Sequence, residues 1–206
     1  FDYALTHQSQ YNIRVITNSW GSSGDFDPND PINIASKAAY DRGITVLFAA
    51  GNEGPGENTH NPYAKAPWVI SVAAGEKNGS LADFLSRGTK GVGGTFEMDG
   101  KTWTWKDAPS VTAPGVDIIS TRVLAPVSSL AITSDAELIE PAYLPFYTSM
   151  SGTSMATPHI AGIAALMRQS FPDASAAEIK ARLMNTANPK LIKSGVITAP
   201  TASVLE

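Results

Sequence analysis

The chain has 206 residues with 43% hydrophobic and 17% charged side chains, and its 15 basic and 19 acidic residues give a formal net charge of −4 at pH 7. This acidic balance excludes the cationic surface by which proteins bind nucleic acid or anionic membranes. The longest apolar stretches, Ile44–Ala50 and Ile160–Met167, fall far below the ~20 residues that span a bilayer. The lack of cysteine excludes disulfides and thiolate metal sites.

The first residues predict a helix that is entered partway. No methionine begins the chain, and Phe1–Leu5 place apolar side chains at helical spacing without a capping residue before them. We therefore expect a chain that is part of a longer one. Val15–Thr17 is a short β-branched run, which predicts a strand that ends at Ser19–Gly21.

The next segments predict a parallel α/β sheet. Asp30 followed by Pro31 is typical of a helix start, and Gly43 is typical of a helix end. Ile44–Ala50 and Val69–Ala74 are continuous apolar runs, as in strands that are covered on both faces.

The middle of the chain follows a different pattern. Asp99-Gly100 lies between two short strand-like runs, which predicts a β-hairpin within 88–110. Val111–Thr121 predicts one further strand around Pro114-Gly115. The stretch 122–149 shows no period, and we expect a long irregular excursion there.

Two helices are predicted near the end. The first carries an apolar stripe, and the second begins with a capping box, Ser175 and Glu178, before a core face. Alternating strands and helices predict an α/β fold: three layers around a doubly wound, mostly parallel sheet. Functional sites of such sheets lie at the carboxyl ends of strands, here Ser19–Gly21 and Gly51-Asn52. The apolar stripe of the first of these two helices comprises Ile160, Ile163, Ala164 and Met167.

The segment Gly152–His159 directly precedes the first of these helices. A serine at a helix start has backbone N–H groups and the positive end of the helix dipole beside it, which would stabilise an anion. Alternatively, Ser154 or Thr153 merely caps the helix.

Gly152–Gly162 resembles the nucleophile motif of the subtilisin-like serine proteases, the subtilases, and Phe48–Gly54 resembles their oxyanion-hole segment. Asn18–Gly21 and Thr112–Gly115 match two further segments of that family. The resemblance implies a subtilisin-like fold with its N-terminal portion missing. Residues 1–206 would be one partial peptidase domain, with a hairpin insertion at 89–110 and a loop insertion at 122–149.

The resemblance also implies residue roles. Ser154 would be the nucleophile that attacks a peptide carbonyl, and Asn52 would donate a hydrogen bond to the oxyanion, although Asn52 taken alone is more simply a turn residue between two glycines. The strand-like edge would pair with the substrate backbone, and three small residues would leave room for a large apolar side chain before the scissile bond. Trp20 either narrows a subsite or is a half-buried core aromatic. The expected substrate-binding residues are Ser19, Trp20, Gly21, Ala49, Ala50, Gly51 and Thr153.

The nucleophile lacks a visible general base. The family's catalytic Asp and His precede the segments matched here, and we find neither motif. His159 lies five residues after Ser154 and points away from it on a helix, so we expect it to pack against the helix instead. His60 lies in a polar loop and His7 on an outer helix face, so both are expected to be exposed.

We therefore expect a parent serine endopeptidase that cleaves proteins or peptides, and an isolated chain that is inactive. Its partners would be the upstream half of the catalytic domain and a propeptide, and its truncated sheet edge would favour self-association. The alternative is a pseudoprotease or peptide-binding module without catalysis. A dinucleotide-binding domain is not expected, because no G-x-G-x-x-G motif follows a predicted strand.

The family's usual secretion predicts an extracellular protein whose signal peptide precedes Phe1. No cofactor is expected for catalysis, and three scattered histidines do not predict a transition-metal site. Structural calcium is compatible with the resemblance, because a loop near Ala64–Val69 corresponds to a weak cation site in some members of the family.

Overall fold

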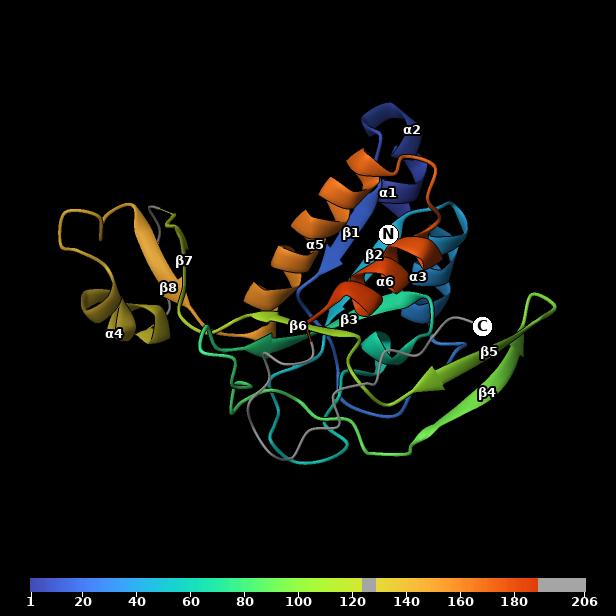
Figure 1. Cartoon of the computed structure of the whole chain (residues 1–206), viewed down its shortest axis with the longest axis horizontal. Helices are drawn as coiled ribbons and strands as arrows, with labels where there is room; N and C mark the ends of the chain where they lie inside the picture. Colours follow the sequence, from blue (N-terminus) through green and yellow to red (C-terminus); the bar gives the residue numbers. More distant parts are fainter. Residues whose placement is uncertain (124–128, 189–206) are drawn as a thin grey trace.

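A four-stranded parallel sheet forms the centre of the computed structural model, which describes residues 1–123 and 129–188 (Figure 1). The spatial order is β1 (Val15–Asn18), β2 (Thr45–Ala49), β3 (Val69–Gly75) and β6 (Val111–Pro114). Every residue of β2 and β3 is buried, as the continuous apolar runs predict. The predicted α/β fold class is confirmed.

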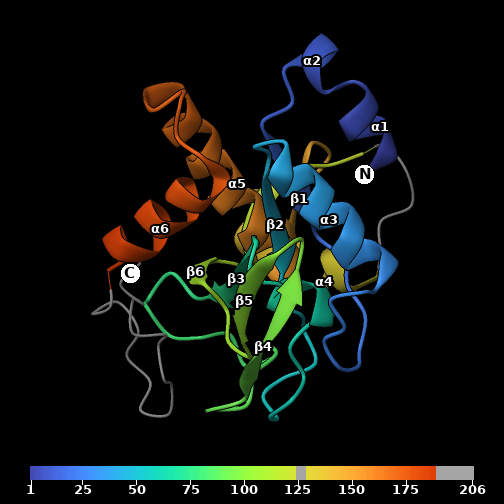
Figure 2. The same cartoon turned by 90° about the vertical axis from the view of Figure 1, so that its right-hand side faces the viewer.

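Helices cover both faces of this sheet, which gives three layers (Figure 2). On one face, α5 (Thr153–Ser170) and α6 (Ala176–Thr186) share a core with β2, β3 and β6. On the other face, α3 (Pro31–Asp41) and the 3₁₀ helix η1 (Pro62–Lys65) enclose a second core around Phe48. Two short helices, α1 (Asp2–Thr6) and α2 (Gln8–Tyr11), precede the sheet.

The helix ends follow the predicted capping chemistry. The Asp30 carboxylate accepts a hydrogen bond from the backbone N–H of Ile32 at 2.7 Å, and Gly43 takes φ +78° just beyond α3. Ser175 and Glu178 form the predicted capping box of α6, whose Ile179 and Leu183 are buried. Local hydrogen bonds therefore set where these helices begin.

The apolar stripe predicted for α5 is correct in part. Ile160 and Ala164 are buried, but Ile163 is 45% exposed and Leu166 is 64% exposed. The buried face follows residues 153, 157, 160, 164 and 168, and Ile163 lies beside it rather than on it. The helix therefore has an exposed apolar face, and its single charged residue, Arg168, is on the buried side.

The predicted hairpin is confirmed. β4 (Gly93–Met98) pairs antiparallel with β5 (Lys101–Lys106), and Asp99 and Gly100 form its turn with φ of +54° and +70°. Its apolar side chains pack on the body of the protein, with ring centroids 5.4 Å apart for Trp68 and Trp103.

The expectations for the following segment are wrong. Val111–Thr121 is two strands rather than one, because the chain turns at Asp117, where φ is +53°. The second strand, β7 (Ile118–Thr121), leaves the main sheet and pairs antiparallel with β8 (Tyr147–Met150). The stretch expected to be irregular also contains α4 (Ser129–Leu138). We call residues 118–150 the arm; residues 124–128 within it lie outside the described residues.

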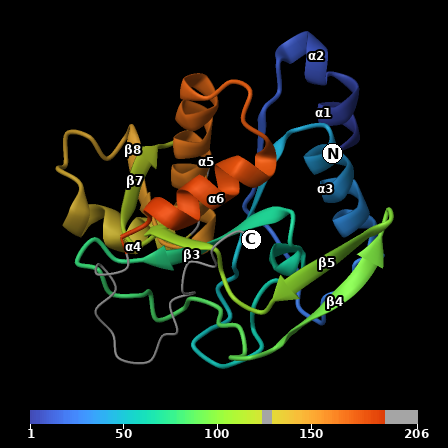
Figure 3. The same ribbon diagram turned by 45° about the vertical axis from the view of Figure 1, so that its right-hand side comes forward.

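The hairpin and the arm lie on opposite sides of the sheet, as the rotated view also shows (Figure 3). Across residues 1–123 and 129–188, no helix combines the length and apolar character needed to cross a bilayer.

Candidate active site

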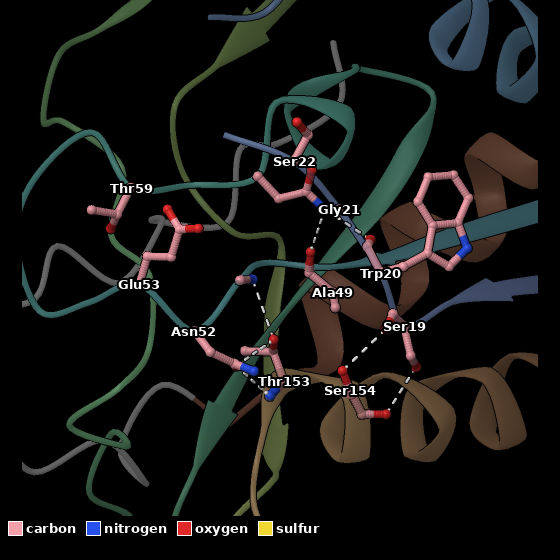
Figure 4. Close-up of a pocket in the computed structure, with 12 residues that line it drawn as sticks. Ser19, Trp20, Gly21, Ser22, Ala49, Asn52, Glu53, Thr59, Thr153 and Ser154 are labelled. Carbon is pink, nitrogen blue, oxygen red and sulfur yellow. Dashed lines mark hydrogen bonds between the residues drawn. The ribbon is translucent and has the colours of Figure 1, made fainter. Parts of the chain in front are cut away.

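Ser154 lies in the first turn of α5, at the end of the sheet where β1 and β2 terminate (Figure 4). Gly152 is the N-cap residue, and it has no side chain with which to cap the helix. Among the described residues, the Ser154 N–H of this first turn has no acceptor and is available to an incoming one, and the dipole of an 18-residue helix favours negative charge there. The alternative that Ser154 or Thr153 caps the helix is wrong.

Two reciprocal hydrogen bonds connect Ser154 to the segment after β1. The Ser19 hydroxyl donates to the Ser154 carbonyl oxygen at 2.9 Å, and the Ser154 hydroxyl donates to the Ser19 carbonyl oxygen at 3.2 Å. Figure 4 shows the two serines facing each other. The nucleophile expected from the sequence and the expected substrate edge are therefore in direct contact.

Asn52 is held with one orientation of its amide. Its Oδ1 accepts hydrogen bonds from the Thr153 backbone N–H at 2.9 Å and from the Thr153 hydroxyl at 2.8 Å, and that hydroxyl accepts from the Gly51 N–H at 3.2 Å. Among the described residues, no hydrogen bond engages the Asn52 Nδ2. A Cβ at Gly152 would lie 3.3 Å from this Nδ2, so glycine leaves the space in front of the amide free.

Thr153 was expected to bind substrate, but its side-chain oxygen contacts other residues of the site. Its side chain is almost fully buried, at 1% exposure, and its polar contacts hold Asn52 and the backbone of Gly51. It lines the cavity described next, but its hydrogen bonds orient the amide of Asn52.

A cavity of about 270 Å³ lies between the segment after β1 and the segment after β2. The predicted site residues that line it come from both segments and from α5. Ala50 is the exception, because its side chain is fully buried in the core of the α5 face. The lining consists of Ser19, Trp20, Gly21, Ser22, Ala49, Gly51, Asn52, Glu53, Thr59, Asn61, Thr153 and Ser154.

Trp20 lies at the rim of this cavity. Its side chain is 45% exposed, and its ring contacts Phe48 at 5.2 Å and Tyr63 at 5.8 Å between centroids, both edge to face. The half-buried aromatic that the sequence suggests is therefore observed, and the narrowing of a subsite by Trp20 stays a prediction.

Asn61 is a lining residue that the sequence did not indicate. Its Nδ2 donates to the carbonyl oxygen of Trp20 at 3.2 Å and to that of Ala49 at 2.9 Å. A Cβ at Gly21 would lie only 2.4 Å from the same Nδ2. The amide therefore joins the two walls of the cavity and is its floor. In the sequence, Asn61 is a polar residue before Pro62, and this pattern indicates only a turn.

Each of the three histidines has a partner away from Ser154. His7 and His159 bond to the carbonyl oxygens of Tyr3 and Met155 within their own segments. His159 is exposed, so the expected packing role is wrong, because the buried face of α5 is elsewhere. His60 was expected to be exposed but is 2% exposed, with Nδ1 3.1 Å from Asp107 Oδ1 and Nε2 2.8 Å from Ser71 Oγ.

In the loop near Ala64–Val69, where structural calcium was expected, two carbonyl oxygens already accept hydrogen bonds. The carbonyl oxygen of Ala66 accepts from the N–H of Val69, and that of Pro67 accepts from the Lys180 ammonium at 2.8 Å. The Lys65 ammonium lies in the same loop and pairs with Asp107. Within the described ranges, no group of three or more acidic or histidine side chains is arranged to hold a metal. Structural calcium, at this loop or elsewhere, stays a prediction.

Comparisons with known proteins find a matching family and similar solved structures. The model of the subtilase family matches residues 2–201. The chain is 34% identical over 181 residues to the serine protease AprX of Bacillus subtilis, covering 85% of this chain, and 36% identical over 181 residues to subtilisin DY of Bacillus licheniformis, covering 87%. Among solved structures, Sphericase matches with a TM-score of 0.65 at 27% identity and S41 psychrophilic protease with 0.64 at 29%, each over 89% of this chain.

The chain spans about half or less of these relatives. It covers 38% of AprX, 51% of subtilisin DY and 52% of each of the two solved structures. The matched part includes the cavity, Ser154 and Asn52.

Proposed function

The chain belongs to the subtilase family, and from that premise we propose that it supplies the nucleophile, the oxyanion donor and part of the substrate cleft of a serine endopeptidase. The observation that carries this proposal is the arrangement of Asn52, Thr153 and Ser154 at the start of α5. It places a fixed amide and the backbone N–H of Ser154 beside a serine hydroxyl.

The chemistry follows from these groups. The Ser154 Oγ attacks the peptide carbonyl carbon while a base takes its proton, and the carbonyl oxygen becomes an anion. The Asn52 Nδ2 and the Ser154 N–H donate to that anion without reorganising. The base then protonates the leaving amine as the C–N bond breaks, and water hydrolyses the acyl-enzyme in the same way.

The cleft supports recognition of an extended peptide. Ser19–Gly21 continues β1 beyond its last ladder pair, so its backbone is placed to pair with substrate. Ala49 and Gly51 leave space for the side chain before the scissile bond, and Asn61 closes that space below. We expect a large apolar side chain to be preferred there, and a peptide library that favours charged residues would contradict this.

We propose that the base and its orienting carboxylate come from a segment outside residues 1–206. All three histidines are engaged elsewhere, and the relatives extend well beyond the matched part. The exposed apolar face of α5 gives such a segment a surface to cover. In the chain alone, that face favours self-association. As for other members of the family, we propose that the protein acts outside the cell and matures from a propeptide.

A fluorophosphonate probe, which reacts only with an activated serine, tests the proposal. The full-length protein should be labelled at Ser154 and should hydrolyse casein, whereas the Ser154→Ala variant and the chain of residues 1–206 should not. Asn52→Ala should slow the labelling of the full-length protein and lower its kcat by about 10²–10³-fold, as loss of an oxyanion donor typically does. A full-length protein that binds peptides but is never labelled would replace the protease with a pseudoprotease.

A further inference from the structure

A buried polar cluster lies directly beneath the cavity. The side chains of His60 and Asp107 are both 0% exposed, and their Nδ1 and Oδ1 atoms are 3.1 Å apart. Ser71, in the middle of β3, contacts the other ring nitrogen at 2.8 Å, and the Lys65 ammonium is 3.2 Å from Asp107 Oδ1. Neither Ser154 nor Asn52 contacts this cluster, and the proposed chemistry does not use it.

The cluster holds the segment that forms the floor of the cavity. His60 lies between Thr59 and Asn61, and both of these line the cavity. The backbone N–H of Asn61 donates to the Ala50 carbonyl oxygen at 2.9 Å, and its side chain joins the two walls. Because the His60 ring is anchored on both sides, the backbone on either side of it has little freedom to move.

Asp107 connects this floor to the hairpin. It follows β5 directly, and its carboxylate accepts a hydrogen bond from the Thr89 N–H at 2.9 Å. A Cβ at Gly88 would lie 1.7 Å from the Asp107 carbonyl oxygen, so the segment before β4 and the segment after β5 are in close contact. The aromatic face of the hairpin packs against Trp68 and Phe26, with centroids 5.4 and 5.1 Å from Trp103 and Trp105.

The charges in the cluster are consistent with a neutral histidine between an anion and a hydroxyl. Burial lowers the pKa of His60 despite the opposing effect of Asp107. For Asp107, burial alone would raise the pKa, but the hydrogen bonds of His60 and Thr89 and the charge of Lys65 outweigh it and lower it. His60 therefore donates from Nδ1 to a carboxylate and accepts at Nε2 from the Ser71 hydroxyl.

We propose that His60 and Asp107 are positioning residues for substrate selection: they fix the backbone at 59–61 so that the Asn61 amide closes the floor of the cavity, and they tie this floor to the hairpin. The inference rests on the proposed function, because the cavity is taken as the pocket for the side chain before the scissile bond. The hairpin thus acts on selectivity from beneath the pocket, without touching substrate.

The test compares matched variants of the full-length protein. His60→Leu removes both ring contacts, His60→Gln keeps an amide donor for Asp107, and Asp107→Asn removes the charge. Asp99→Asn is the matched control, because it makes the same change at the exposed hairpin tip, where Asp99 contacts Lys37. For each variant, kcat and KM are measured with peptides that differ only in phenylalanine or alanine before the scissile bond, after active-site titration.

We expect His60→Leu and Asp107→Asn to lower the ratio of kcat/KM for the two peptides about tenfold, mainly through KM, as loss of a buried charged hydrogen bond would. Asp99→Asn should stay within about twofold of the wild type, and His60→Gln should recover part of the loss. Mere destabilisation lowers the titrated active fraction and leaves the ratio unchanged. A ratio within twofold of wild type in both His60→Leu and Asp107→Asn would overturn the inference.

A second measurement separates this inference from the proposed function. If the wild type cleaves no peptide, the proposed function fails, and exchange of the Asn61 side-chain amide protons, followed by NMR, decides the positioning role instead. Slow exchange in wild type and Asp99→Asn that becomes fast in His60→Leu and Asp107→Asn supports it. Equal exchange rates in all four proteins contradict it. Asp107→Asn carries the test if His60→Leu does not fold.

Discussion

Two segments leave the parallel sheet, the hairpin of β4 and β5 and the arm of β7, α4 and β8, and their large side chains have different surroundings. The hairpin packs its aromatic residues on Trp68, Phe26 and Tyr40. The arm leaves a group of large apolar side chains 39% to 62% exposed: Ile119, Tyr143, Phe146, Tyr147 and Met150. An added segment can therefore become part of the core that supports a site, or remain a separate unit with an exposed apolar surface.

Polar contacts differ in the same way. Asp107 at the base of the hairpin connects to His60 and Lys65, which belong to the body. Asp135 of the arm is bonded to Arg122, Thr148 and the Ser149 N–H, all within the arm itself. We therefore expect the hairpin to unfold with the body and the arm to open on its own.

The largest expected effect on stability comes from a substitution that removes the packing of the hairpin. Trp103→Ala removes the ring that contacts Trp68 and Tyr40, and we expect it to lower the free energy of unfolding by about 3 kcal/mol. Tyr143→Ala in the arm, a 53% exposed residue, should change it by less than about 0.5 kcal/mol. Urea titrations of both variants measure the contrast, and equal losses would remove the distinction between the two segments.

The next effect concerns the arm alone. Asp135→Asn leaves the Arg122 guanidinium without its anionic partner and weakens the acceptor of the Ser149 N–H. We expect the arm to open more readily by about 2 kcal/mol, seen as faster amide exchange and faster proteolysis within 134–150. The urea midpoint of the body should hardly change, and a parallel loss of global stability would show that the arm belongs to the core.

A pH titration sharpens the comparison from the side of the hairpin. Because burial lowers the pKa of His60 in the folded state, the unfolded chain binds this proton first as pH falls. Stability should be fully present above pH ~6.5 and decline below it, by at most about 1.4 kcal/mol per pH unit, until His60 is protonated in the folded state. His60→Gln should abolish this step in urea midpoints measured from pH 7.5 to 5. Persistence of the step in that variant would assign it to another group.

The smallest effect tests the tip of the hairpin. Asp99 is largely exposed and lies 3.1 Å from the Lys37 ammonium, which also contacts Asp41. Asp99→Asn should cost about 0.5 kcal/mol or less, and less still in 1 M salt, because exposed ion pairs are screened. Thermal unfolding at two salt concentrations provides the measurement. A larger or salt-independent loss would mean that the turn, rather than the aromatic face, holds the hairpin.

Local signals predicted much of this fold. The runs at Ile44–Ala50 and Val69–Ala74, the caps at Asp30 and Ser175 and the turn at Asp99-Gly100 depend on residues within a few positions of one another. Ser154 and Asn52 also stand in compact motifs, and both line the cavity, while their catalytic roles stay predictions. These segments determine their own structure, but local reasoning still missed the turn at Asp117 and the helix α4.

The misses depend on distant partners. His60 stands in a polar loop, but its burial follows from Asp107, which is 47 positions away. Asn61 bonds to Trp20 across 41 positions, and nothing in the loop indicates this contact. Ile163 fits an apolar stripe, yet which side of α5 is buried depends on how the helix meets the sheet. Patterns of period 3.6 or 2 carry no information about such pairings.

The contacts that assemble the cleft have a consequence for the order of folding. Ser19 and Ser154 are 135 positions apart, and Gly51 and Thr153 are 102 positions apart. Closing chain segments of this length is entropically costly, so these contacts should form after the local helices and the hairpin. During refolding, reagents that recognise the assembled cleft would therefore detect only molecules in which the start of α5 has already docked against the segments after β1 and β2.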